Sequence, residues 1–180
     1  MADPSFRLRL ARRSDVPTLE RLIERSVEQL GAGWYSAEQI ASALRFMFGV
    51  DTQLIDDATY HVVHHDERIV AAGGWSRRRT LFGGDQWKHE ADLPLDPTTE
   101  AARIRAFFVD PGFARRGLGR ALFDRCVADA RAAGFTRLEL MATLPGEPLY
   151  RALGFADEER IELPLPDGVR VPLVRMSRAI

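Results

Sequence analysis

The sequence predicts one mixed α/β domain over residues 1–180, with a mostly antiparallel central sheet flanked by helices. Its 180 residues are the length of one domain and can bury a core without disulfides or a structural metal. Segments with the period-2 pattern of strands mostly follow one another as hairpins. Only one strand–helix–strand unit occurs, in the middle of the chain, which argues against a doubly wound parallel sheet.

The first elements are a strand and a helix. Apolar and arginine residues alternate over 6–10, as in a half-buried strand. Ser14 and Asp15 then offer side-chain oxygens that could cap a helix. Apolar residues continue at helical spacing to Leu30, and Gly31 is a suitable stop.

A second helix and a hairpin follow. Ser36 and Gln39 form a capping box at the start of this helix, which we expect to end at Gly49. Residues 60–65 and 69–75 have the composition of two strands joined by a tight turn.

The second half opens with a polar segment, 77–99, that is long for a loop inside one domain and is therefore either mobile or functional. The remaining predicted elements are a strand at 103–109, a helix at 117–133, a strand at 137–142, a helix at 148–153, and strands at 161–163 and 169–176. The C-terminal strand could pair across a homodimer.

Composition excludes several classes of function. The net charge of −1 gives no basic field for nucleic acid or an anionic membrane. No apolar run approaches the roughly 20 residues of a membrane span, and none of signal-peptide type begins the chain. Cys126 is the only cysteine, so no intramolecular disulfide can form. We therefore expect a cytoplasmic protein.

The segment from Val109 to Arg120 carries the clearest chemical signal. A predicted strand ends there, and Gly117 and Gly119 open a helix. The free N–H groups of a helix N-terminus attract anions, and glycines let a phosphate approach the backbone closely. The basic side chains around this turn are Arg115, Arg116 and Arg120. The segment predicts a phosphate or pyrophosphate ligand.

Two nucleotide-binding motifs match this segment less well. A P-loop needs a lysine and a hydroxyl residue after the glycine, but Leu118 and Gly119 follow Gly117. A dinucleotide fingerprint needs a third glycine where Leu122 stands, although Glu139 lies about 20 residues further on. A helix that simply starts with these residues, without a ligand, is the remaining alternative.

Two motifs resemble those of the GNAT acetyltransferases. The turn is similar to their coenzyme A loop, Gln/Arg-x-x-Gly-x-Gly/Ala, with Gly117 and Gly119 matching and Ala114 departing at the first position. Residues 150–155, Tyr-Arg-Ala-Leu-Gly-Phe, resemble the family's Tyr-x-x-Leu-Gly-Phe helix. The order of elements from residue 6 to 176 also matches. The resemblance implies the GNAT fold and acetyl-coenzyme A as cosubstrate, without a metal, for transfer to a small-molecule or peptide amine.

The resemblance also implies roles for individual residues. The coenzyme loop comprises Arg115, Arg116, Gly117, Leu118, Gly119 and Arg120. The preceding strand would splay from its neighbour, so that the main chain of Phe107, Phe108 and Val109 holds the pantetheine arm and the thioester. Tyr150 would protonate the leaving thiolate, and Thr143 stands where some members carry an asparagine that contacts the coenzyme. The amine would attack directly, through a tetrahedral intermediate stabilised by main-chain N–H near Val109.

The base and the acceptor site are less defined. Glu100, at the entry to the predicted strand, is the first candidate for general base, and His89 is the second. Trp34 and Tyr35 lie where the family often forms its acceptor pocket, although packing would explain them equally well. Other residues considered are the arginine run 77–79, which could attract an acidic acceptor, and His61, His64 and His65, which lack the cysteine or carboxylate partners of a metal site.

Two other functions remain open at this point. The same fold could hold an acyl-coenzyme A without catalysis, as a sensor. Alternatively, the glycine turn could serve an enzyme that uses ATP or NAD. Cys126 lies on the expected buried face of its helix and is not a candidate nucleophile.

Overall fold

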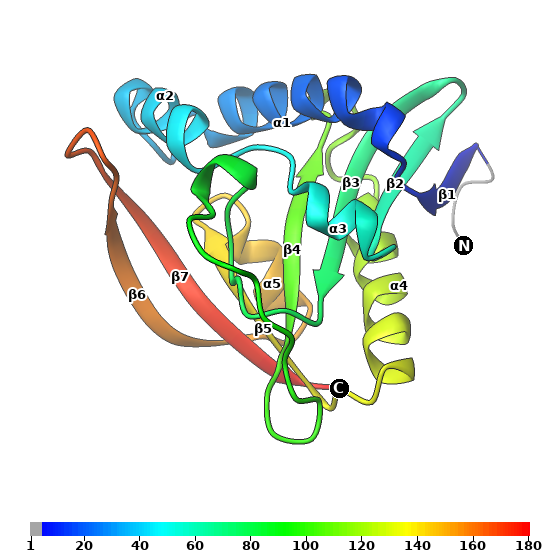
Figure 1. The fold of residues 1–180 in the computed structure, drawn as a ribbon. Helices are drawn as coiled ribbons and strands as arrows, with labels where there is room; N and C mark the ends of the chain where they lie inside the picture. The colour runs from blue at the N-terminus through cyan, green and yellow to red at the C-terminus, as the bar shows by residue number, and fades with distance from the viewer. Residues whose placement is uncertain (1–4) are drawn as a thin grey trace.

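The computed structural model describes residues 5–180 and contains a seven-stranded sheet in the order β1-β2-β3-β4-β5-β7-β6 (Figure 1). The strands are β1 Phe6–Leu10, β2 Tyr60–His65, β3 Arg68–Ser76, β4 Ala102–Val109, β5 Arg137–Thr143, β6 Ala156–Pro164 and β7 Arg170–Ala179. The helices are α1 Val16–Gly31, α2 Ala37–Phe46, α3 Thr52–Asp56, α4 Leu118–Ala132 and α5 Glu147–Ala152. Short 3-10 turns cover Arg13–Asp15, Asp85–Trp87 and Pro111–Phe113.

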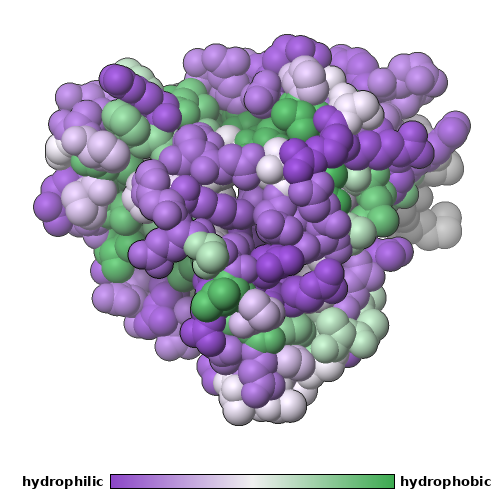
Figure 2. Space-filling view, in the orientation of Figure 1, coloured by the Kyte–Doolittle hydropathy of each residue, from purple (hydrophilic) through white to green (hydrophobic). Residues whose placement is uncertain are grey.

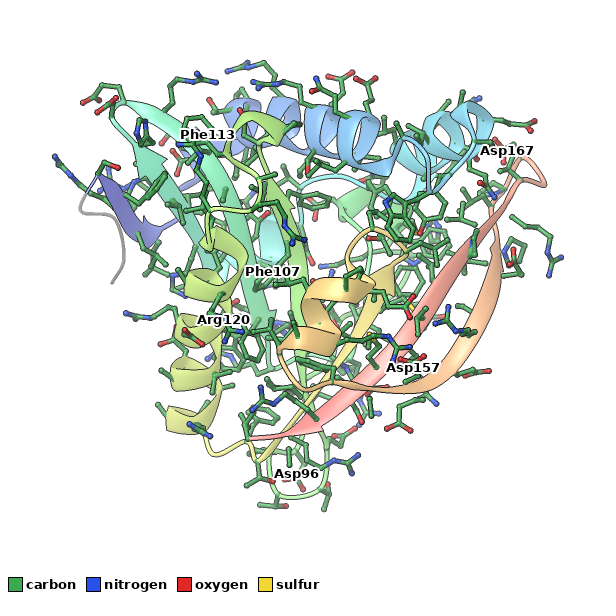
Figure 3. The ribbon with its side chains drawn as sticks, turned by 180° about the vertical axis from the view of Figure 1, so that it is seen from behind. Asp96, Phe107, Phe113, Arg120, Asp157 and Asp167 are labelled. Carbon is green, nitrogen blue, oxygen red and sulfur yellow. The ribbon has the colours of Figure 1, made fainter. Side chains whose placement is uncertain are left out.

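Helices cover both faces of the sheet. The buried residues of α4 and α5, including Phe123, Cys126 and Tyr150, form one core with β4, β5 and β7. On the opposite face, α1 and α3 pack residues such as Leu19 and Leu54 against β2 and β3. Figure 3 looks onto the face that carries α4 and α5, and Figure 1 onto the face that carries α3. Within residues 5–180, no helix is long and apolar enough to cross a membrane.

The centre of the sheet is divided between two strand directions. All neighbouring strands are antiparallel except β4 and β5, which run parallel. Their pairing covers only Ala102 with Leu138 and Arg103 with Glu139. Beyond these pairs β5 is paired only with β7, which lies beside it from Arg137 to Thr143. Within residues 5–180, the C-terminal half of β4 is therefore paired with β3 on one side and with no strand on the other. We call this unpaired edge of β4, where it faces the end of β5, the opening.

A β-bulge lies where β4 leaves β5. Ala72 and Gly74 of β3 face Phe108 and Arg105, so Ala106 and Phe107 together oppose Gly73. Ala106 has a positive φ of 54°, which is uncommon for a residue with a side chain. A bulge adds a residue and bends the strand. It thereby turns the end of β4 at the opening.

The elements match the predicted order with local differences. The short helix α3 was not predicted, and α2 ends at Phe46 instead of Gly49. Ser36 and Gln39 form the expected capping box. The carboxylate of Asp15 does not cap α1: it accepts from the Arg12 N–H and pairs with Arg9.

The C-terminal strand β7, which the sequence suggested could pair across a homodimer, is not at an edge of the sheet. β7 lies between β5 and β6, so its backbone groups are already committed on both edges. The free edge at this end of the sheet belongs to β6. Its side chains are mostly charged and exposed, which is typical of an edge that resists further strand pairing.

The long 77–99 loop is attached to the rest of the molecule by buried charges. Arg105 of β4 donates to the carbonyls of Thr80 and Gly83 and to Asp51, which caps α3. Lys88 also binds Asp51. The loop is thus fixed to the rest of the molecule at Thr80, Gly83 and Lys88, which flank the apolar residues Phe82 and Trp87.

Candidate functional site

The opening beside β4 presents main-chain groups of Phe107 and Val109. Asp110 donates its N–H to Val70 of β3 at 2.8 Å. Because N–H directions alternate along a strand, the amides of Phe107 and Val109 point away from β3, toward the opening. These are two of the three residues whose main chain the sequence assigned to the site. Phe108 turns its amide to β3 and packs its ring, 6.1 Å from that of Phe48, on the α1 face.

The Val109 amide has a partner that the sequence did not indicate. Its N–H lies 3.3 Å from Oγ of Ser26, a buried residue of α1. This is a long hydrogen bond, at the weak end of the range. A ligand carbonyl that takes the Val109 N–H must displace or share the serine hydroxyl. The Phe107 N–H has no such side-chain acceptor among residues 5–180.

The turn between β4 and α4 forms an anion-binding concavity. Arg115 and Gly117 have positive φ values of 63° and 81°. No protein acceptor is found among residues 5–180 for the main-chain N–H groups of residues 115–120, and the first intrahelical bond runs from Ala121 to Gly117. Successive free N–H groups at a helix N-terminus attract phosphate. A Cβ on Gly119 would lie 2.9 Å from the end of the Leu149 side chain of α5, which would have to move.

Exposed arginines surround this turn. The side chains of Arg115, Arg116 and Arg120 all reach solvent, and Arg116 lies over the ring of Phe113 at 5.1 Å. Figure 3 shows Arg120 on α4, below the turn that carries Phe113. The site thus keeps its positive charge although Ala114 lacks the side chain of the family motif.

A buried carboxylate fixes the base of the turn. Asp110 is 2% exposed and accepts the Gly112 N–H at 2.9 Å. Arg25 of α1 and Arg68 of β3 pair with its other oxygen at 2.7 and 3.4 Å. Sequence reasoning did not single out these two arginines, because their common partner joins segments far apart in the chain.

Tyr150 lies on α5 at the edge of the opening. Its ring packs edge-on against Phe107 of β4, with 6.3 Å between centroids, and against Phe155. Figure 3 shows Phe107 between α4 and α5. The Tyr150 hydroxyl makes no hydrogen bond within residues 5–180, yet it is not among the buried unpaired polar atoms. Burial raises the pKa of Tyr150 well above its ordinary value, so the hydroxyl keeps its proton.

Thr143 lies beside Tyr150 through the turn that joins β5 to α5. Its hydroxyl accepts the Gly146 N–H at 3.2 Å. A Cβ on Gly146 would contact both Thr143 Oγ1 and the Tyr150 ring. Thr143 therefore shapes the turn, and its hydroxyl proton is still available to a ligand.

Glu100 does not fit the role of general base. It lies before β4, at the end of the strand remote from the opening, where it accepts the Asp96 N–H and faces Arg79 at 3.6 Å. A rise of about 3.3 Å per residue puts the start of β4 roughly 17 Å from Phe107. Figure 3 shows Asp96 and Phe107 well separated. His89 is exposed in the 77–99 loop, with no hydrogen bond or ring contact to the opening among residues 5–180.

The two aromatic residues between α1 and α2 have different environments. Tyr35 is buried: its hydroxyl donates to Pro172 O and accepts the Leu144 N–H, both at 2.8 Å. Tyr35 therefore ties β7 and the β5–α5 turn to the α1–α2 connection. Trp34 is 52% exposed.

The other chemically reactive side chains are committed elsewhere. Cys126 is fully buried under α4, and burial raises the pKa of its thiol. His61 binds Asp129 beneath the same helix. Arg78 pairs with Asp57, and Arg79 with Glu100. Residues 5–180 contain no group of three or more potential metal ligands.

Comparison with known proteins agrees with this architecture. The model of the acetyltransferase (GNAT) family matches residues 19–155, more than half of the chain. A search of curated proteins by sequence finds no match.

Several solved structures share the fold at low sequence identity. A GCN5-related N-acetyltransferase from Rhodopseudomonas palustris gives a TM-score of 0.72 at 18% identity, covering 100% of this chain and 99% of its own. The PaiA N-acetyltransferase from Thermoplasma acidophilum, in complex with coenzyme A, gives 0.65 at 16%, covering 97% and 99%. The ribosomal-protein-S18-alanine N-acetyltransferase from Escherichia coli gives 0.59 at 18%, covering 97% and 94%. The match over residues 19–155 shows that this chain belongs to the GNAT acetyltransferase family.

Proposed function

We propose that this protein is an N-acetyltransferase that moves the acetyl group of acetyl-coenzyme A to a primary amine. The observation that carries the proposal is the convergence of three features at one opening. These are the unpaired end of β4, the free N–H groups of the 115–120 turn, and the Tyr150 hydroxyl. Acetyl-coenzyme A carries a thioester at one end and a pyrophosphate further along, so one molecule can contact all three features at once.

Each part of the cosubstrate has a matching group in this arrangement. The pyrophosphate fits the 115–120 turn, where N–H groups and arginines supply positive charge. The pantetheine amides fit the strand-like main chain of Val109. The thioester carbonyl fits the Phe107 N–H, which would stabilise the oxyanion of a tetrahedral intermediate. The PaiA N-acetyltransferase structure, in complex with coenzyme A, supports a coenzyme A ester as the ligand.

Tyr150 is the proposed acid for the leaving group. The amine nitrogen bonds to the carbonyl carbon, the C–S bond then breaks, and the thiolate takes up a proton. An ordinary tyrosine with a pKa near 10 and a thiol near 8.5 make full transfer uphill by roughly 2 kcal/mol in water. Because burial raises the pKa of Tyr150 further, we propose that it acts mainly as a hydrogen-bond donor to the developing thiolate.

The proton of the attacking amine requires another acceptor. Glu100 was the only carboxylate that the sequence suggested as general base, and it lies at the far end of β4 from the opening. We propose that water receives this proton and that the neutral fraction of the amine reacts. The amine attacks the thioester directly, without a covalent acyl-enzyme. Cys126 is buried and is therefore not a candidate nucleophile.

A thiol-release assay tests this proposal. Acetyl-coenzyme A is supplied with a panel of primary amines, and free coenzyme A and acetylated amine are both quantified. Equal formation of the two products supports transfer. Binding of acetyl-coenzyme A without amine-dependent thiol release, across alkyl, aryl and peptide amines, would instead identify an acyl-coenzyme A sensor.

A further inference from the structure

The face of the sheet opposite the coenzyme features carries a second apolar cluster. The coenzyme features, Tyr150 and the β4–α4 turn, belong to the face covered by α4 and α5. On the other face, β4 and β5 are covered by α1, α2 and the 77–99 loop, and their C-terminal halves are not paired with each other. Resting on the proposed function, we infer that the acceptor is a primary amine carrying an apolar aromatic body, bound beside Phe82 and Trp87.

The surface on this second face is apolar but incompletely closed. One cluster joins α2, the 77–99 loop and the inner side of β5, β6 and β7. Six of its residues are buried, whereas nine remain partly exposed; the core under α4 has sixteen buried and five partly exposed. Figure 2 shows hydrophobic residues on this face, on the side where α2 and the β6–β7 hairpin lie. This cluster is therefore less completely covered than the core under α4.

Phe82 and Trp87 form the aromatic part of that surface. Their rings lie 5.4 Å apart at an angle of 33°, and both keep partial exposure. Met141 of β5 and Leu173 of β7 belong to the same cluster, which brings it to the strand that borders the opening. Aromatic groups pack well on such walls, with centroids 4.5 to about 7 Å apart.

Buried charges hold this aromatic pair in place. Arg105 comes from β4 itself, and it donates to the carbonyls of Thr80 and Gly83, on either side of Phe82. Gly83 has a positive φ, and a Cβ there would lie 2.6 Å from Trp87. The wall is thus attached to the strand that forms the opening, and it is pre-shaped before a ligand arrives.

Two carboxylates near the cluster are already paired with basic residues. Asp51 is held by both Arg105 and Lys88. Glu139 is held by both Arg103 and Arg175. Asp92, in the same loop as Phe82 and Trp87, keeps one buried oxygen without a hydrogen bond within residues 5–180, 3.7 Å from Lys88. The inferred preference therefore depends on the apolar wall and not on the surrounding charges.

A substrate comparison with the full-length protein tests the inference. We would measure kcat/KM for 2-phenylethylamine, ethylamine and spermidine at saturating acetyl-coenzyme A. Phenylethylamine and ethylamine have the same reacting group but differ in basicity, so kcat/KM is expressed per concentration of neutral amine and the ratio then isolates the ring. We expect kcat/KM to be at least about tenfold higher for phenylethylamine than for either other amine, since even one methylene in a fitted pocket gives about tenfold. Equal values, or preference for spermidine, would overturn the inference while leaving the transfer reaction established.

Two variants test whether Phe82 and Trp87 cause the preference for phenylethylamine. Phe82→Ala and Trp87→Ala should each raise the KM for phenylethylamine by about tenfold, the value of one aromatic contact, and leave the KM for acetyl-coenzyme A unchanged. Leu93→Ala is the matched control, because Leu93 lies in the same loop, is 56% exposed and is outside the cluster. A preference that survives both aromatic variants would contradict the assigned wall.

A binding measurement keeps the test independent of turnover. Phenylethylamine is titrated calorimetrically into protein saturated with coenzyme A, with ethylamine as reference. Saturable binding of phenylethylamine alone supports the inference, and no binding of either amine overturns it. Failure of coenzyme A itself to bind would contradict the proposed function instead.

Discussion

Tyr150 and Tyr35 are both buried tyrosines, but only one has its hydroxyl satisfied by the protein. Tyr35 makes two hydrogen bonds through its hydroxyl, and Tyr150 makes none within residues 5–180. Removing the Tyr150 hydroxyl therefore costs little stability. Tyr150→Phe should lower kcat by about a hundredfold, the lower end for loss of a general acid. The Kd of acetyl-coenzyme A and the Tm should stay near the wild-type values.

Tyr35→Phe is the matched control for this substitution. It leaves the Pro172 carbonyl and the Leu144 N–H without a partner, which costs about 1–3 kcal/mol of stability. Thermal unfolding should show a lower Tm while kcat stays within a few-fold of wild type. If Tyr150→Phe retains full kcat, Tyr150 is a packing residue and the proposed acid is wrong.

The protonation of Tyr150 makes a prediction about pH dependence. Burial raises the pKa of Tyr150 above its ordinary value of about 10, so the donor form persists at every pH below that. A primary amine of pKa near 10.4 becomes more reactive as it loses its proton. We therefore expect kcat/KM to rise steadily between pH 6 and pH 9.5. A descending limb within that range, absent from protein stability controls, would contradict a protonated Tyr150.

At the scale of single elements, the bulge in β4 is the feature that creates the opening. Gly73 of β3 faces the bulge, and a Cβ there would lie 2.7 Å from the ring of Phe107. Gly73→Ala must therefore displace Phe107, which also contacts Tyr150. Overpacking of this kind costs about 1–3 kcal/mol.

Denaturant unfolding and kinetics check the effect of Gly73→Ala together. We expect lower stability and a reduced kcat, because both rings at the opening move. Gly134→Ala is the control, because Gly134 has a positive φ, its added Cβ would make only an ordinary 3.7 Å contact with Pro97, and it lies just beyond α4, at the end of that helix remote from Gly117. It should lose stability without losing kcat. Unchanged kinetics in Gly73→Ala would show that the Phe107 ring does not position Tyr150.

The elements were largely predictable because each has a local signal. The Ser36 capping box and the apolar stripe of α4 depend on neighbours in sequence, and the structure has both. The glycine turn was found for the same reason. The alternation over 6–10 predicted the strand β1 but not its burial, since Leu8 and Leu10 are 37% and 42% exposed. The short helix α3 was missed because it has only five residues, too few for helical periodicity to show.

The candidate site was predictable only where it follows the chain locally. The contacts of Ser26 with Val109, and of Arg25 with Asp110, join residues more than 80 positions apart, which no pattern in one sequence shows. Glu100 was misplaced for the opposite reason. It is close to β4 in sequence, but an extended strand carries its two ends far apart.

At the scale of the whole molecule, buried histidine makes stability depend on pH. His61 is 1% exposed beneath α4, and its pKa is lowered by burial, although Asp129 opposes this shift. Below about pH 6.5 the unfolded chain takes up a proton that the folded protein refuses. Stability should therefore fall as the pH drops below 6.5 toward the folded-state pKa.

Denaturant unfolding between pH 7.5 and pH 5 measures this effect. His61→Gln cannot titrate and should reduce the slope by up to about 1.4 kcal/mol per pH unit. Burial also lowers the pKa of His64, so a smaller slope should remain. His89→Gln, at an exposed position, is the control and should keep the wild-type slope. An unaltered slope in His61→Gln would contradict a neutral buried His61.

The central claim is that the opening and the 115–120 turn bind acetyl-coenzyme A. Calorimetric titration tests it directly, with ATP and NAD as control ligands. Gly117→Ala and Gly168→Ala make a matched pair: each glycine has a positive φ near 80–90° and no atom within 4 Å of an added Cβ. Both should lose about 1–2 kcal/mol of stability through backbone strain, but only Gly117 lies in the turn.

The account predicts saturable binding of acetyl-coenzyme A to the wild type and to Gly168→Ala, at least tenfold weaker binding to Gly117→Ala, and none of ATP or NAD. The factor of ten corresponds to about 1.4 kcal/mol, roughly one charge-assisted hydrogen bond to phosphate. Folded wild-type protein that fails to bind acetyl-coenzyme A, or that binds ATP or NAD instead, would contradict the account.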